Sequence, residues 1–243
     1  GALDRTVLAK STDNGATWTS RQVFDIPIIY DATSANTTGT PIGISDLNGD
    51  GVADTLFNST DGTGAVIVDN TGVVHIFFGF MNYIDDIAGD SQWSYFPVTN
   101  GIGYWNDNMG NIEPQFIAGI LDLDSTGVLL DNLADPNTEF GQYYSSLTTM
   151  PNAGVDANGC VYAVYTSIME IYNSGSQYYR HVYGVKSCDN GCTWSFPIDL
   201  TSYDEYAECV FPSMAHNVGN QLHFIYQKDH EPGLNLQGDL DPV

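Results

Sequence analysis

Short runs of alternating apolar and polar residues, separated by turns rich in Asn, Asp and Gly, recur along the chain. Segments 66–78, 155–165 and 214–226 each join two extended runs through such a turn and end in β-branched or aromatic residues. A period of two is typical of half-buried β-strands, and the turn residues predict hairpins. We therefore expect an all-β chain in which these segments supply pairs of neighbouring strands.

Two eight-residue segments repeat along the chain, and each follows a short apolar strand. Residues 11–18 read STDNGATW and residues 187–194 read SCDNGCTW. Gly15 and Gly191 are separated by 191 − 15 = 176 residues, which is four times 44. A unit of that length lies within the roughly 40–50 residues of a four-stranded propeller blade, so the repeat predicts a circular array of sheets.

Both segments match the pattern Ser/Thr-x-Asp-x-Gly-x-Thr-Trp at every defined position. This pattern resembles the Asp box, or BNR repeat, of the sialidase-like β-propellers, and the chain is similar to a non-catalytic member of that family. In that family the box joins the third and fourth strands of a blade, far from the catalytic face, which implies a structural role here. The residues concerned are Ser11, Asp13, Gly15, Thr17, Trp18, Ser187, Asp189, Gly191, Thr193 and Trp194.

The resemblance implies a β-propeller of four-stranded antiparallel blades, formed by residues 1–243 as a single domain. At this blade length about five blades fit the chain, and an incomplete ring of six is also open. The chain begins in the strand before the first box and stops after a strand pair at 222–227, so its two ends could complete one blade together. Alternatively, the chain is a fragment of a longer secreted protein.

Residues 46–54, DLNGDGVAD, form the sharpest ligand-like motif. Oxygen donors at alternate positions and a Gly at the sharp turn are what a Ca²⁺ loop requires. The predicted ligands are Asp46, Asn48, Asp50, the backbone carbonyl of Val52 and Asp54. An EF-hand would have Glu where this chain has Phe57, so the loop instead resembles the calcium-binding hairpins of integrin-type propeller repeats. The alternative is a hairpin whose carboxylates only cap its own backbone.

The four cysteines permit three pairings into two disulfides. Cys188 and Cys192 occupy the two variable positions of the second box, on opposite arms of its turn, so we expect a disulfide between them. Cys160 and Cys209 would then pair with each other, and both bonds would indicate an oxidising, extracellular setting. A zinc site is the competing interpretation, but the C-x₃-C spacing without a convergent His fits it poorly.

Charge excludes several classes of partner. The chain has 30 acidic and 6 basic residues, giving a formal net charge of −24. A nucleic-acid surface needs clustered Lys and Arg, and an anionic membrane surface attracts basic segments, so neither partner is expected. No stretch approaches the roughly 20 apolar residues that span a bilayer, so membrane insertion is not expected.

Catalysis is the next question, because sialidases hold the substrate carboxylate with three arginines and use a Tyr/Glu nucleophile pair and an Asp acid/base. The arginines here are Arg5, Arg21 and Arg180, and none lies in the Arg-Ile-Pro motif of that family. A neutral-glycan hydrolase needs two carboxylates flanking a cleft, and the acids to inspect first are Glu113, near Tyr104 and Trp105, and the cluster 229–231. Solvated loops explain both places better than catalysis does.

We therefore expect a secreted or cell-surface binding module with structural calcium, whose ligand is a glycan or a protein. Tyrosines such as the pairs 143–144 and 178–179, together with Trp105, could stack on sugars, although blade packing uses aromatic residues as readily. The runner-up is a glycoside hydrolase with a carboxylate pair in the central cleft. A third interpretation is a structural subunit of a larger extracellular assembly.

Overall fold

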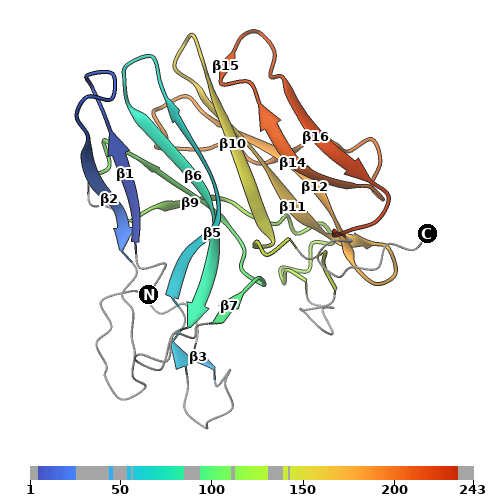
Figure 1. Ribbon diagram of the computed structural model, residues 1–243. Helices are drawn as coiled ribbons and strands as arrows, with labels where there is room; N and C mark the ends of the chain where they lie inside the picture. Colours follow the sequence, from blue (N-terminus) through green and yellow to red (C-terminus); the bar gives the residue numbers. More distant parts are fainter. Residues whose placement is uncertain are drawn as a thin grey trace.

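A computed structural model describes residues 5–25, 44–45, 54–55, 57–84, 94–110, 113–130, 139–141 and 143–234. Every regular element in these residues is a β-strand, and no helix occurs among them (Figure 1). The all-β prediction is confirmed for the part of the chain that the structure describes. No helix in that part is long and apolar enough to cross a membrane.

Sixteen strands follow one another along the chain. The first nine are β1 (Arg5–Lys10), β2 (Thr19–Asp25), β3 (Ile44–Ser45), β4 (Asp54–Thr55), β5 (Phe57–Val68), β6 (Val74–Ile84), β7 (Ser94–Phe96), β8 (Ile102–Asn106) and β9 (Gln115–Ala118). The others are β10 (Thr148–Asp156), β11 (Val161–Asn173), β12 (Tyr178–Ser187), β13 (Ile198–Asp199), β14 (Glu208–Met214), β15 (Asn217–Val218) and β16 (Phe224–Asp229).

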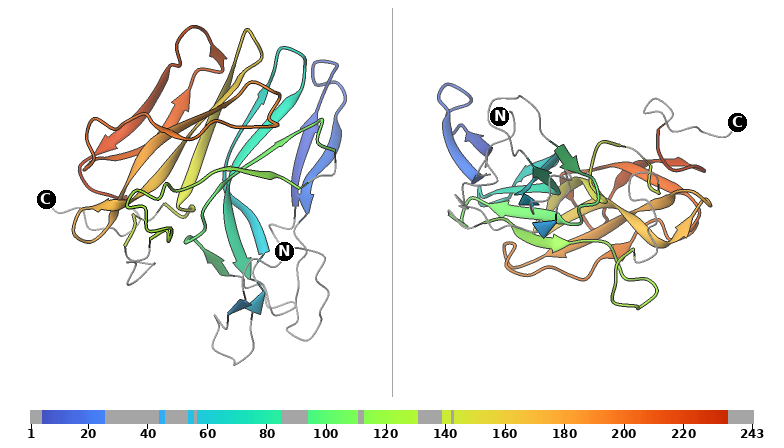
Figure 2. Two further views of the ribbon diagram at one scale, coloured as in Figure 1. Left: turned by 180° about the vertical axis from the view of Figure 1, so that it is seen from behind. Right: turned by 90° about the horizontal axis from the view of Figure 1, so that it is seen from below.

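Two antiparallel sheets of consecutive strands form the centre of the molecule. One has the order β5-β6-β8-β9, with β7 beside the far end of β6, and the other has the order β13-β12-β11-β10, with β15 parallel to β10. The hairpins β1–β2 and β14–β16 form separate two-stranded sheets, and β3–β4 is a further short pair. Figures 1 and 2 show the β1–β2 and β14–β16 hairpins on opposite sides of the two central sheets.

The hairpins predicted at 66–78, 155–165 and 214–226 are confirmed by the pairing of β5 with β6, β10 with β11, and β14 with β16. The turn between β5 and β6 is closed by Asp69, whose Oδ1 accepts the Thr71 and Val73 N–H groups at 2.8 and 2.9 Å. The equivalent turn before β11 is closed by Asp156, whose Oδ1 accepts the Asn158 and Cys160 N–H groups. An Asx turn explains why these sequences fold back locally.

Strands β6 and β11 are packed on both faces, because sheets lie on either side of them. Phe77 of β6 faces a core shared with Tyr165 and Val185 of the neighbouring sheet, whereas Phe78 faces a core shared with Val23 of β2. On the far side, Val164 and Val182 pack against Cys209, Met214 and Val218 of the β14–β16 region. The four sheets therefore form a stack, and β6 and β11 have apolar residues on both faces for that reason.

One expectation about the arrangement of sheets is not met among the described residues. The β1–β2 and β14–β16 hairpins do not pair into one sheet. Between the two repeated segments, which follow β1 and β12, the described residues show the β3–β4 pair, the β5-β6-β8-β9 sheet and the strands β10 to β12. The number of blades stays a prediction, because the described residues do not cover every segment between the two turns.

Candidate binding site

The two repeated segments fold into turns with the same hydrogen bonds, and we refer to residues 11–18 as turn 1 and residues 187–194 as turn 2. In turn 1, Asp13 Oδ1 accepts the Thr17 N–H at 2.8 Å and Asp13 Oδ2 accepts the Thr17 hydroxyl at 2.6 Å. In turn 2, Asp189 makes the equivalent bonds to Thr193 at 2.9 and 2.5 Å. A serine completes each turn, because Ser11 and Ser187 donate to the aspartate and accept the glycine N–H.

These contacts change the acidity of the two aspartates in the same way. The Thr17 hydroxyl is the main reason that the pKa of Asp13 falls from 3.8 to about 2, and the Thr193 hydroxyl lowers the pKa of Asp189 to about 2. In each turn the Asn–Gly pair has positive φ, with 56° and 87° in turn 1 and 61° and 82° in turn 2. The carboxylate oxygens are therefore engaged within the turn.

The cysteines pair differently from the prediction. Cys160 is bonded to Cys188, while Cys192 is a free, exposed thiol and Cys209 a free, buried one. The expected Cys188–Cys192 and Cys160–Cys209 bonds are wrong because the register of β11 with β12 decides the pairing. Val161 lies opposite Ser187, which places the preceding Cys160 opposite the following Cys188 with a Cα–Cα distance of 4.1 Å. One disulfide is compatible with an oxidising compartment.

The predicted calcium ligands cannot be assembled from the described residues. Asp46, Asn48, Asp50 and Val52 lie outside them, and of Asp54 only the backbone is described, in β4 opposite Ser45. A different acidic group occurs in the described part, where carboxylate oxygens of Asp122, Asp124 and Glu170 lie within 4.8 Å of one another. Glu170 is buried, and its two oxygens accept the Leu123 and Leu130 N–H groups at 2.8 and 2.9 Å.

Turn 1, turn 2 and the turns after β5, β10 and β14 lie at one end of the stack, which we call the turn end. Hydrogen bonds join neighbouring turns there: Lys10 Nζ donates to the Gly72 carbonyl, and Asn70 Nδ2 donates to the Asp156 carbonyl. Asn106 Nδ2 likewise donates to the carbonyl of Asn190 in turn 2. The chain enters β10 at the other end, which we call the pocket end (Figure 1).

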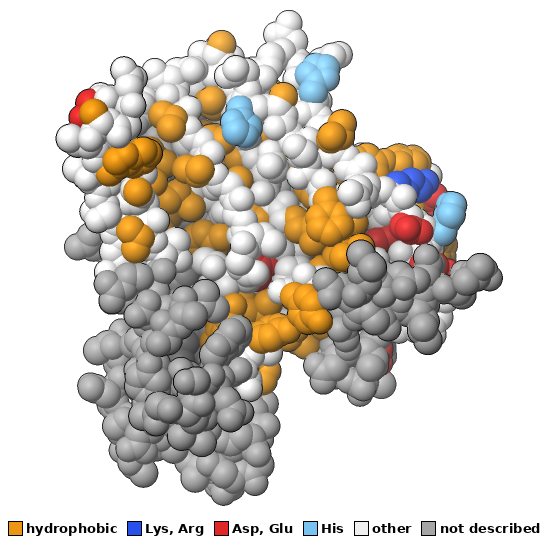
Figure 3. Space-filling model, in the orientation of Figure 1, with side chains coloured by type: hydrophobic (Ala, Val, Ile, Leu, Met, Phe, Trp, Pro, Cys, Tyr) orange, Lys and Arg blue, Asp and Glu red, His pale blue; other side chains and the backbone are white. Residues whose placement is uncertain are grey.

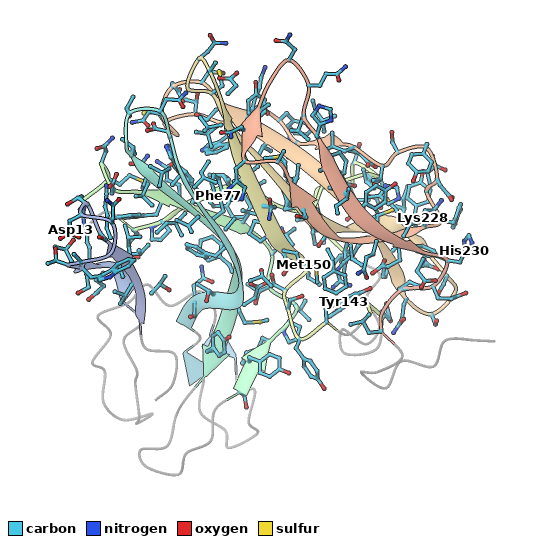
Figure 4. All side chains as sticks on the ribbon, turned by 45° about the horizontal axis from the view of Figure 1, so that its top comes forward. Asp13, Phe77, Tyr143, Met150, Lys228 and His230 are labelled. Carbon is cyan, nitrogen blue, oxygen red and sulfur yellow. A yellow bond between two sulfur atoms is a disulfide. The ribbon has the colours of Figure 1, made fainter. Side chains whose placement is uncertain are left out.

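A pocket of about 200 Å³ opens at the pocket end. The described residues that line it are Tyr95, Pro97, Phe140, Gly141, Tyr143, Tyr144 and Ser145. None of them carries a formal charge, and four are aromatic. Figure 4 shows Tyr143 near the start of β10, far from Asp13 of turn 1. Figure 3 shows hydrophobic side chains gathered at this end of the described surface.

Burial and strain fix the walls of this pocket. A Cβ on Gly141 would overlap the backbone of Gly233, so the chain can approach residues 232–233 only because residue 141 is a glycine. Tyr144 has φ +55°, a left-handed conformation that non-glycine residues rarely adopt, and its side chain is 57% exposed. The Ser145 hydroxyl is buried and has no hydrogen-bond partner among the described residues. One residue of the described lining therefore carries a buried oxygen without a partner in the described part of the chain.

Behind the pocket wall lies a buried polar group that sequence reasoning did not predict. The Tyr143 hydroxyl donates to Glu208 Oε1 at 2.7 Å, and Glu208 Oε2 accepts the Arg180 N–H at 2.6 Å. The Arg180 guanidinium lies 4.8 Å from the centre of the Tyr143 ring and donates to the Gly141 carbonyl at 3.1 Å. Burial is the main cause of the raised pKa of Glu208 and of the raised pKa of Tyr143.

Tyr143 and Glu208 have the residue types of a sialidase nucleophile pair, but the pKa of Tyr143 and the burial of Glu208 do not suit that role. A nucleophilic tyrosine needs a lowered pKa, whereas the pKa of Tyr143 is raised, and Glu208 is fully buried. The two arginines with described side chains, Arg21 and Arg180, do not converge, because Arg21 donates to the Asp107 carbonyl and covers the Trp105 ring. Arg5 has no described side chain.

The other candidates for catalysis or sugar stacking lie apart. Glu113 is exposed, while Tyr104 and Trp105 are completely buried, so these three residues form no cleft. In the cluster at 229–231, Asp229 Oδ1 accepts the His230 N–H at 2.6 Å and caps its own turn. Of the aromatic residues singled out, Tyr143 and Tyr144 reach the pocket, whereas Trp105, Tyr178 and Tyr179 are core residues.

A buried carboxylate close to the pocket is structural. Asp61 of β5 accepts hydrogen bonds from Thr63, Ser146 and Thr149, so it joins β5 to the start of β10. Its oxygens have enough donors to satisfy a buried charge. The group holds the segment that carries Ser145, and nothing in it faces the pocket lining.

Comparison with known proteins gives little further. No family model matches the chain, and no curated protein matches it. Among solved structures, a "Hadza microbial sialidase Hz136" matches 63% of this chain with a TM-score of 0.32 and 14% identity. The chain spans 28% of that structure's length. A likeness this weak carries no argument about the fold or the function of this chain.

Proposed function

We propose that the chain is a secreted or cell-surface binding module of the propeller type, which holds its ligand at the pocket end without changing it chemically. The observation that carries this proposal is the uncharged, aromatic pocket at the start of β10. Aromatic walls with a few polar atoms are typical of binding sites. The turns that resemble Asp boxes lie at the other end of the stack, which agrees with their structural role.

Calcium is part of the same proposal, as a structural ion held by Asp46, Asn48, Asp50, Val52 and Asp54. A ligand bound only by the folded state raises the melting temperature by mass action. We expect Ca²⁺ to raise the melting temperature, EDTA to lower it, and Asp50→Asn to weaken the response to the ion. An unchanged melting temperature in EDTA argues against the ion.

A glycoside hydrolase is the second candidate, favoured by the Tyr143–Glu208 hydrogen bond beside Arg180. The raised pKa of Tyr143 makes it the weaker of the two, because a tyrosine nucleophile must lose its proton to react. The two candidate functions differ in that only a hydrolase would cleave the glycan that it binds.

A glycan array combined with a screen for hydrolysis of aryl glycosides tests the choice. Binding without release of the aryl group supports the binding module. Release that disappears in the Glu208→Gln variant, with the fold intact by circular dichroism, supports the hydrolase instead.

A further inference from the structure

We infer that the pocket binds the ring of a neutral sugar, with tyrosine faces covering its C–H groups and the Ser145 hydroxyl bonding one of its hydroxyl groups. This inference rests on the proposed binding function and names the ligand class of the same pocket. Its two supports are the unpartnered buried hydroxyl and the uncharged lining.

The Ser145 hydroxyl points to a ligand with hydrogen-bonding groups. Ser145 is only 4% exposed, and its oxygen finds no partner in the described part of the chain, although buried hydroxyls are normally satisfied. The neighbouring Ser146 differs, because its buried hydroxyl donates a hydrogen bond to the Thr148 carbonyl at 2.7 Å. An unmade hydrogen bond in a pocket wall is completed by a ligand hydroxyl, which can both donate and accept.

The aromatic lining sets the shape of that ligand. The C–H groups on one face of a sugar ring are apolar, and their slight positive charge matches the negative face of an aromatic ring. Tyr144 is 57% exposed and reaches the pocket from a backbone with φ +55°, and Tyr95 lines the same pocket from β7. The Tyr144 side chain therefore remains accessible to a ligand in the free protein.

The size of the pocket favours a single ring. Its volume of about 200 Å³ is below the roughly 300–1,000 Å³ of pockets for drug-sized molecules. A terminal or isolated sugar unit is therefore the expected occupant, and the rest of a glycan would lie outside.

Charge selects a neutral sugar over an acidic one. None of the described residues in the lining carries a formal charge, and the Arg180 guanidinium behind it is covered by the Tyr143 ring and paired with Glu208. The whole chain has a net charge of −24, which opposes the approach of an anion. A carboxylate on the ligand would find no accessible partner in the described lining.

The test is a titration of the full chain with methyl glycosides of neutral hexoses and with the methyl glycoside of a uronic acid. We expect at least one neutral glycoside to bind and the uronic acid to bind at least tenfold more weakly. Tyr144→Ala should weaken the neutral glycoside at least tenfold, and Ser145→Ala at least threefold. The matched control is Tyr206→Ala, which removes another tyrosine of 57% exposure and should leave the affinity unchanged.

Ser145→Ala separates binding from folding, because removing an unpartnered buried hydroxyl should leave the melting temperature unchanged or raise it. Unchanged affinity in both pocket variants, or preference for the uronic acid, overturns the inference. If a glycan array shows binding that Tyr144→Ala does not alter, the proposed binding function stands and the pocket assignment fails. If neither the array nor the titration shows binding, both fail.

Discussion

Turn 1 and turn 2 have nearly the same sequence and the same internal hydrogen bonds, yet their surroundings differ. Trp18 of turn 1 is 64% exposed and donates from Nε1 to its own turn, at the Gly15 carbonyl. Trp194 of turn 2 instead packs edge-on against Phe77 and Tyr104 of the neighbouring sheet. The comparison shows that the local sequence determines the turn, while the neighbouring sheet determines how much stability depends on it.

The largest contrast between the turns is expected at their glycines. A Cβ on Gly191 would overlap the Tyr104 hydroxyl, whereas a Cβ on Gly15 meets only Trp18 at 3.9 Å. Both glycines have positive φ, which costs an alanine about 1–2 kcal/mol, and overpacking adds about 1–3 kcal/mol for Gly191→Ala alone. Urea unfolding should therefore show a loss of about 2–5 kcal/mol for Gly191→Ala and about 1–2 kcal/mol for Gly15→Ala. Equal losses would contradict the role of Tyr104.

The disulfide is the next largest difference, because turn 1 has Thr12 where turn 2 has Cys188. Replacing Cys160 and Cys188 with serine should cost about 2–4 kcal/mol, since the bond closes a loop of 28 residues in sequence. Replacing Cys192 with serine, the control, should cost little because its thiol is free and exposed. Peptide mapping checks the pairing directly, and a Cys188–Cys192 peptide would contradict the structure.

Acid titration should affect the two turns alike, because the same hydrogen bonds lower both aspartate pKa values to about 2 from 3.8. A lowered folded pKa means that the stabilisation is present above pH 3.8 and is lost as pH falls from 3.8 towards 2. Asp13→Asn and Asp189→Asn should each flatten this limb of the melting-temperature profile. If only one of the two substitutions reduces the fall in melting temperature at acid pH, the two turns titrate differently.

The smallest expected effect is a pH dependence confined to the surroundings of turn 2. His75 is fully buried beside Tyr104, with its Nδ1 2.7 Å from the Tyr104 hydroxyl and its Nε2 3.4 Å from Asp69 Oδ2. Burial lowers its pKa below 6.5 despite the opposing charges of Asp69 and Asp107. The unfolded chain then binds the proton more readily, so stability should decrease as pH falls below 6.5.

A His75→Gln variant checks this assignment, because glutamine keeps a polar group beside Tyr104 without titrating near neutral pH. The melting temperature of this variant should change less between about pH 8 and 5 than that of the parent chain. A profile unchanged by the substitution would assign the pH dependence to another group.

The sequence predicted those features that depend on neighbouring residues. Asp13 and Asp189 are within hydrogen-bond reach of their own turns, and the hairpins at β5–β6 and β10–β11 follow from alternation and Asx turns. The disulfide could not be read in this way, because its pairing depends on the register between β11 and β12. A C-x₃-C spacing contains no information about that register.

The sequence predicted only part of the pocket lining. The Tyr143–Tyr144 pair was a candidate for sugar contact, but nothing nearby indicated that Tyr95 of β7 would line the same pocket or that the adjacent Ser145 would be buried. The contacts of Glu208 with Tyr143 and Arg180 link residues 65 and 28 positions apart, which no local pattern records. The calcium prediction stays a prediction, because its loop lies outside the described residues.

The packing of β6 on both faces constrains how this molecule can change over evolutionary time. Phe77 and Phe78 serve two different cores, so slipping the strand by one residue would exchange them and spoil both packings at once. The segments that line the pocket do not pack into two cores in this way, since they lie at the margin of the stack. Substitutions in those segments can therefore change the ligand specificity of the molecule during evolution, while the register of the stacked strands is kept.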